Sequence, residues 1–150
     1  MNCAVLRVSG EDFNVDAFLR EHPRIVPDVV WHVGDQQIIR GPCATSGFNT
    51  MLAESTTIEQ AVKDLRDSVA HLRPCAEDLT AAGATSIVDF GMTISLGEEV
   101  MTSAHFDPIV LGLLASMRVG LSVSVYLSDE DSPEEDLDDD SSSDPNDPVR

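Results

Sequence analysis

The sequence predicts an α+β fold: a two-layer sandwich with a largely antiparallel sheet and helices packed on one face. Two patterns support this prediction. Several segments alternate apolar and polar residues with a period of two, as strands do when only one face is buried. The segments between them repeat apolar residues at 3.6-residue spacing, as helices do when they cover such a sheet. The expected element order is β-α-β-β-β-α-(α)-β-α-β.

The N-terminal part of the chain predicts four strands and one helix. Asn14 is suited to cap the helix, Val15, Phe18 and Leu19 form its apolar stripe, and Pro23 ends it. The strands are expected at residues 4–8, 29–33, 37–40 and 48–53, with a turn at 34–35 and a break at 41–42.

The longest helix is expected to begin at a capping box formed by Thr56 and Glu59. Its apolar stripe continues to Leu72. Pro74 is expected to interrupt the helix, because proline lacks the N–H that the helix interior requires. A short second helix is then expected over residues 75–82.

Two further strands and one helix are expected after that point. Residues 87–96 alternate most clearly and predict a strand. Asp107 is suited to cap a helix whose first residue is Pro108. Residues 121–127 alternate again and predict the last strand.

The composition changes abruptly after Ser128. Residues 129–150 contain 11 acidic residues and one basic residue, so they carry −10 of the total charge of −18, and residues 1–128 carry −8. The sequence predicts one folded domain over residues 1–128 and a disordered acidic tail over 129–150, since the tail has too little apolar surface to offset its ordering entropy. Deleting the tail should leave the melting temperature nearly unchanged.

Charge and cysteine usage argue against several classes of function. Nucleic-acid binding needs clustered Lys and Arg, and the sequence has no such cluster. Nothing in it resembles a signal peptide or an apolar segment of the ~20 residues that span a membrane. The three cysteines, Cys3, Cys43 and Cys75, are odd in number and widely spaced, which fits a reducing cytoplasm. We therefore expect a cytoplasmic protein without a nucleic-acid or membrane partner, whose acidity either keeps it soluble or attracts a basic partner.

The sequence predicts no metal, cofactor or catalytic site. Its four histidines are not paired with each other or with cysteine at metal-ligand spacing, and it contains no phosphate-binding glycine loop and no nucleophile elbow. The alternative hypothesis with a catalytic function is a small enzyme that uses Cys43 or His32 in the central loop.

Four segments resemble a known family: LRVSGEDFNVDAFL at residues 6–19, SGFNTMLAES at 46–55, IVDFGMTISL at 87–96 and GLSVSVYLS at 120–128. Together they are similar to a widespread family of small, functionally uncharacterised bacterial proteins of the domain-of-unknown-function type. Thr50 departs mildly from the alternating strand that follows SGF in that family. The resemblance covers residues 3–128 and implies the fold, but it implies no catalytic residue.

Small acidic proteins of this kind also resemble immunity proteins, which bind and neutralise a toxin. This resemblance is an analogy between classes of protein. The leading hypothesis is therefore a non-enzymatic immunity protein or inhibitor that binds a basic, nuclease-like toxin through an acidic surface. A small regulatory or ligand-binding module is the second hypothesis. The oligomeric state stays open. The candidate contact residues are Trp31, Asp35, Asp89, Glu98, Glu99 and Tyr126.

Overall fold

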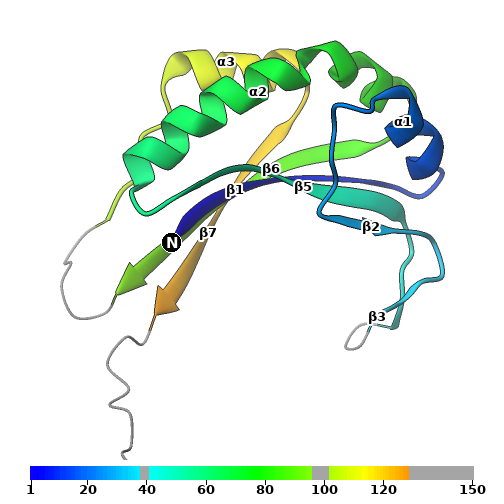
Figure 1. The fold of residues 1–150 in the computed structure, drawn as a ribbon, viewed down its shortest axis with the longest axis horizontal. Helices are drawn as coiled ribbons and strands as arrows, with labels where there is room; N and C mark the ends of the chain where they lie inside the picture. The colour runs from blue at the N-terminus through cyan, green and yellow to red at the C-terminus, as the bar shows by residue number, and fades with distance from the viewer. Residues whose placement is uncertain (38–40, 96–101, 129–150) are drawn as a thin grey trace, which may run out of the picture.

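The computed structural model describes residues 1–37, 41–95 and 102–128, and these residues confirm the α+β fold. In the described part of the chain, helices lie over one face of a five-stranded sheet and leave the opposite face uncovered (Figure 1). The predicted acidic tail, residues 129–150, lies outside the described residues. Within them, none of the helices combines the length and the apolar character that crossing a membrane requires.

The main sheet consists of five strands: β1 (Asn2–Gly10), β2 (Val29–Trp31), β5 (Ser46–Ser55), β6 (Thr85–Ser95) and β7 (Gly120–Ser128). Their order across the sheet is β2-β5-β1-β6-β7, so the first strand of the chain lies at the centre. β1 pairs antiparallel with both β5 and β6, and β2 pairs antiparallel with β5. β6 and β7 run parallel, which makes the sheet mixed but predominantly antiparallel.

Three helices cover the sheet: α1 (Val15–Glu21), α2 (Ile58–Ala81) and α3 (Pro108–Ser116). The predicted caps of α1 and α3 are confirmed. Asn14 accepts a hydrogen bond from the backbone N–H of Ala17, and Asp107 accepts from those of Ile109 and Val110. α3 lies within the crossover connection that the parallel strands β6 and β7 require.

The hydrophobic core fills the space between the helices and the covered face of the sheet. Leu6 of β1, Phe48 of β5 and Phe90 of β6 are almost completely buried there. Leu65 and Val69 of α2 pack into the same cluster with no exposed surface. The alternation of the strands therefore places their apolar residues under the helices, as the sequence predicts.

The start of α2 differs from the prediction by one residue. Its N-cap is Thr57, whose side chain accepts a hydrogen bond from the backbone N–H of Gln60. The capping box assigned to Thr56 and Glu59 is therefore wrong. The carbonyl oxygen of Thr56 accepts a hydrogen bond from the side chain of Asn2 in β1, which holds this residue outside the helix.

The predicted interruption at Pro74 is also wrong. α2 continues through Pro74 to Ala81 as one helix of 24 residues. A proline inside a helix costs about 3 kcal/mol, because it removes one backbone hydrogen bond and its ring clashes with the carbonyl four residues earlier. Burial of one helix face on both sides of the proline offsets this cost. The buried residues of that face around Pro74 are Leu72, Cys75, Ala76 and Leu79.

A short arm departs from the sheet after β2. We define the arm as residues 32–37 and 41–45. β2 ends at Trp31 and not at residue 33, and a two-stranded sheet of β3 (Gln36–Gln37) and β4 (Gly41–Pro42) follows. Gly41-Pro42 was expected to break the return strand at residues 37–40, yet it forms β4 and pairs with β3, while residues 38–40 lie outside the described residues. Gly41 adopts a positive φ of 76°, which glycine allows without strain. The arm projects from the uncovered side of the sheet (Figure 1).

Candidate binding surface on the open sheet face

The face of the main sheet that none of the described helices covers is called the open face below. Alternation along the strands decides which side chains it carries, because residues next to core positions point the other way. Its central residues come from four strands: Cys3, Val5 and Arg7 of β1, Asn49, Met51 and Glu54 of β5, Ile87, Asp89 and Gly91 of β6, and Ser122, Ser124 and Tyr126 of β7.

A chain of polar contacts crosses the middle of the open face. Nη2 of Arg7 lies 2.6 Å from Oδ2 of Asp89, and the hydroxyl of Ser124 donates to Oδ1 of the same carboxylate at 2.7 Å. The side chain of Asp89 is only 12% exposed, whereas that of Arg7 is 53% exposed. Asp89 therefore acts as a fixed acceptor that orients Arg7, and the guanidinium is the part a partner can reach.

Tyr126 lies at one end of the open face. Its ring covers Gly91, since a Cβ atom at Gly91 would stand 3.1 Å from Cε2 of Tyr126 and 3.3 Å from Sγ of Cys3. The tyrosine nevertheless remains 53% exposed. The exposed Glu54 lies at the same end, opposite Cys3 in the β1–β5 register. This end thus offers an anchored aromatic ring and a carboxylate.

A groove of about 660 Å³ lies at the other end, between the open face and the arm. Trp31 at the end of β2 and Asp35 of the arm line one side of it, and Arg7, Asn49 and Ile87 line it from the rest of the sheet. Oδ1 of Asn49 is buried and has no hydrogen-bond partner among the described residues. The groove therefore combines an aromatic wall with polar side chains from the arm and the sheet.

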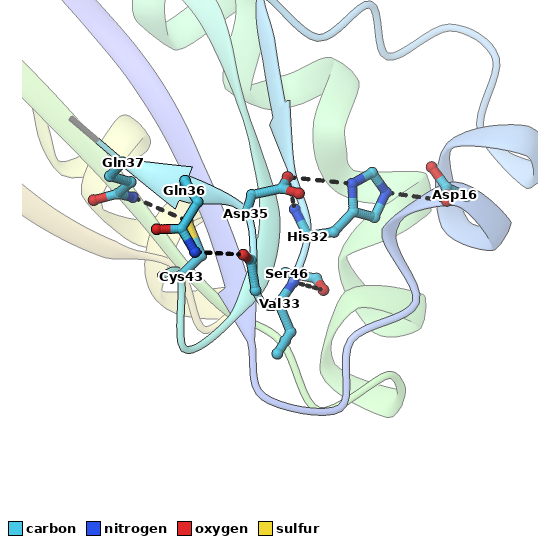
Figure 2. A network of polar contacts seen from close by, with 9 residues as sticks. Asp16, His32, Val33, Asp35, Gln36, Gln37, Cys43 and Ser46 are labelled. Carbon is cyan, nitrogen blue, oxygen red and sulfur yellow. Dashed lines mark hydrogen bonds and ion pairs between the residues drawn. The ribbon is translucent and has the colours of Figure 1, made fainter. Parts of the chain in front are cut away.

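The arm is held in place by hydrogen bonds at its base (Figure 2). The backbone N–H of His32 donates to Oδ2 of Asp35 at 2.7 Å, and the ring Nε2 lies 3.1 Å from Oδ2 of Asp16 in α1. The N–H of Val33 donates to the hydroxyl of Ser46 at the start of β5. These contacts fix Asp35 and the groove wall relative to the sheet.

The candidate contact residues of the sequence fall into two groups. Trp31 and Asp35 line the groove, and Asp89 and Tyr126 lie on the open face, so four of the six share one side of the molecule. Glu98 and Glu99 lie outside the described residues.

Sequence reasoning missed Arg7 and Asn49. Arg7 could have been noticed as a charged residue within an otherwise apolar strand. Its pairing with Asp89, however, depends on a register between strands about 80 residues apart in the sequence.

Cys43 and His32 do not form a nucleophile–base pair. Cys43 is 8% exposed, and its sulfur accepts a hydrogen bond from Nε2 of Gln37 at 3.1 Å. The polar contacts of the His32 ring run to Asp16 and Asp35 (Figure 2). No group of three or more His, Cys, Asp and Glu side chains suited to a metal ion occurs among the residues that the structure describes.

No family model, curated protein or solved structure matches this chain. The resemblance to a family of small bacterial proteins therefore stays a prediction. Function has to be inferred from the geometry and the chemistry of the open face itself.

Cys75 is expected to be an unreactive thiol. It is buried within α2, not at a helix start, and burial raises the pKa of its thiol. Its thiolate fraction at pH 8 is therefore small, and we expect Cys75 to react with iodoacetamide at least about tenfold more slowly than the half-buried Cys3. Peptide mass mapping after timed alkylation measures both rates, and equal rates would contradict this assignment.

Proposed function

We propose that this protein is a non-enzymatic cytoplasmic binding protein: an immunity protein or inhibitor that neutralises a basic, nuclease-like bacterial toxin. The observation that carries the proposal is the open face. It leaves an anchored aromatic ring, an oriented guanidinium and an aromatic-lined groove uncovered on one side of a strongly acidic chain.

The composition of the open face is that of a protein interface. Buried centres of interfaces are enriched in Tyr, Trp, Met and Arg, and the largest losses on truncation occur at Trp, Tyr and Arg. The open face and groove expose Tyr126, Met51 and Arg7 and carry Trp31 on their margin. Tyr126 and Trp31 are packed against glycines, Gly91 and Gly47, so little side-chain entropy remains to be lost on binding.

The charge distribution favours a basic partner. Asp89 is neutralised by Arg7, so the exposed carboxylates that a partner meets are Glu54 at one end of the open face and Asp35 at the other. The whole chain carries −18 and attracts cations over a longer range. Complementary charge at the margin of an interface mainly accelerates association and rejects wrong partners.

The proposal is tested by sequencing the neighbouring genes and co-expressing this protein with a basic nuclease-like toxin domain encoded there; the absence of such a gene would count against the proposal. We expect protection of the cells, and inhibition of the purified toxin at a 1:1 ratio. Tyr126→Ala should weaken binding at least tenfold in calorimetry, because it removes the exposed aromatic anchor of the open face. Ile109→Ala is the matched control: Ile109 is exposed on α3, on the helix side of the sheet, and its loss should leave binding unchanged. Equal affinity for both variants, or no protection by the wild type, would refute the proposal.

Removing residues 129–150 should slow association without changing dissociation. The deletion takes away −10 of the −18 charges while leaving every described residue in place. Charges outside the contact surface act on the encounter rate and on its salt dependence. Stopped-flow measurements at several ionic strengths should show a lower association rate and a shallower salt dependence for the truncated chain. A changed dissociation rate would instead show that the tail contacts the partner.

The groove supports a second candidate, a small-ligand module. Its volume is suited to a small molecule, and Trp31 and Ile87 would supply apolar walls for it. A ligand there should raise the melting temperature of the wild type and of Tyr126→Ala, but not of Trp31→Ala. A toxin partner should instead lose affinity in both variants.

A further inference from the structure

The strand β7 forms one edge of the main sheet over nine residues. Among the described residues, no strand pairs with its outer side. The opposite edge, β2, has only three residues and continues into the arm. Proteins usually protect a long edge with charged residues, proline or a bulge, because its free backbone groups attract other strands. The segment GLSVSVYLS contains no charged residue and no proline, and its register with β6 is regular.

The helix-side face of β7 is also incompletely covered. Val123 and Val125 lie opposite the core residues Phe90 and Met92 in the β6 register, and Leu127 lies opposite the half-buried Ile94. They nevertheless remain 47%, 52% and 63% exposed, although their neighbours on β6 are packed under the helices. Two further apolar side chains, those of Ile109 and Leu111, are exposed on α3, the helix that packs against β7. Apolar residues and unpaired backbone thus occur at the same edge.

The sequence of β7 is complementary to itself when read in the opposite direction. A twofold axis at Ser124 places Leu121 opposite Leu127 and Val123 opposite Val125 of a second copy, with Ser122 opposite Tyr126. All four aliphatic side chains then meet on the same face, where cross-strand pairs stabilise a sheet. Closed twofold symmetry requires such a self-matching surface.

The charges that flank β7 favour the same orientation. Arg118 precedes the strand and is exposed, whereas the sequence after Ser128 begins with Asp129, Glu130 and Asp131. Antiparallel pairing brings a basic start next to an acidic end at both ends of the strand pair. Parallel pairing would instead bring the two acidic segments together and would cost Coulomb energy.

We propose that two copies of this protein associate through antiparallel pairing of their β7 strands, centred on Ser124, to form one continuous ten-stranded sheet. The pairing covers the aliphatic side chains of β7 on the helix side. It leaves the open face, the groove and the arm of each copy accessible, so the dimer presents two equivalent binding surfaces. This inference stands on the edge strand and does not depend on the proposed function.

Sedimentation velocity of the full chain over ~1 to ~300 μM tests the association, since a dimer dissociates on dilution. We expect a single equilibrium between monomer and dimer. Val125→Lys should weaken it at least tenfold, because it places a charge opposite Val123 of the second copy. Ser122→Lys carries the same new charge on the open face of the same strand and should weaken it less. A chain that stays monomeric over the whole range would overturn the proposal.

A cysteine at the axis tests the register. Ser124→Cys, in a Cys3→Ser background, lies opposite itself across the axis at a Cα–Cα distance of about 5 Å, within reach of a disulfide. Ser122→Cys in the same background stands ~13 Å from its copy and should not link. Mild oxidation followed by peptide mapping should therefore identify a 124–124 link. A dimer that links at 122 and not at 124 would refute the proposed register.

Salt separates this association from binding of a basic partner. Each copy carries −18, so screening should strengthen the dimer as sodium chloride rises from ~50 to ~500 mM. Binding of a basic toxin should weaken over the same range. Weakening of the dimer by salt would count against an apolar strand pair.

Discussion

Gly47→Ala is expected to lower the free energy of unfolding by about 3 kcal/mol, at the upper end of what overpacking costs. A Cβ atom at Gly47 would meet the carbonyl oxygen of Val8 in the neighbouring strand β1 and would stand 2.5 Å from Cζ2 of Trp31. Neither atom can move cheaply. The carbonyl belongs to the central strand of the sheet, and the indole ring lies against the backbone of β5.

Gly112→Ala provides the matched control for this substitution. Gly112 lies inside α3, and a Cβ atom there would meet no atom within 4 Å. The same chemical change should therefore stabilise the protein by about 0.5–1 kcal/mol, since alanine has the higher helix propensity. Urea unfolding followed by circular dichroism measures both. A loss at Gly47 no larger than about 0.5 kcal/mol would show that Trp31 can leave its position without consequence.

The second large effect is expected for Phe48→Ala, with a loss of about 3–5 kcal/mol of stability. Phe48 is fully buried, and its ring centroid lies 5.9 Å from that of Phe18 and 6.4 Å from that of Phe13. The substitution leaves a cavity where α1 rests on the sheet. Because Asp16 of α1 contacts His32, loosening this helix should also release the base of the arm.

Hydrogen exchange distinguishes the local effect from the global one. In Phe48→Ala, amides of α1 and the arm should exchange faster than those of α2. Tyr126→Ala is the matched control, because it removes a similar ring from an exposed position and should cost less than half as much stability. Equal losses for the two variants would mean that the Phe13–Phe18–Phe48 cluster is not the main support of α1.

Local sequence patterns predicted most of the elements, but not how all of them meet. The stripe from Ile58 to Leu72 required a helix against a sheet, and the alternation after Ile87 required a strand. The continuation of α2 through Pro74 could not be predicted locally, because burial of residues beyond the proline decides it. The parallel pairing of β6 with β7 likewise depends on where α3 returns the chain.

The candidate binding surface was predictable only in part, for a similar reason. Trp31 and Tyr126 are recognisable as aromatic residues on polar strand faces. The groove, however, requires the arm to project beyond the sheet, and this depends on the positive φ of Gly41 and on the contacts of His32 with Asp16. The salt bridge between Arg7 and Asp89 requires a register that no local pattern specifies.

The central position of β1 has a consequence for folding during synthesis. β1 is made before both of its neighbours, residues 46–55 and 85–95. One side of it can therefore pair with β5 early, whereas the other side stays unpaired until residue 95 has left the ribosome. Both pairings close long loops before they contribute stability, which gives slow folding for a chain of this size. Until Thr85–Ser95 emerges, the nascent chain presents an apolar strand with one unpaired side, the kind of segment that chaperones bind and that aggregates without them.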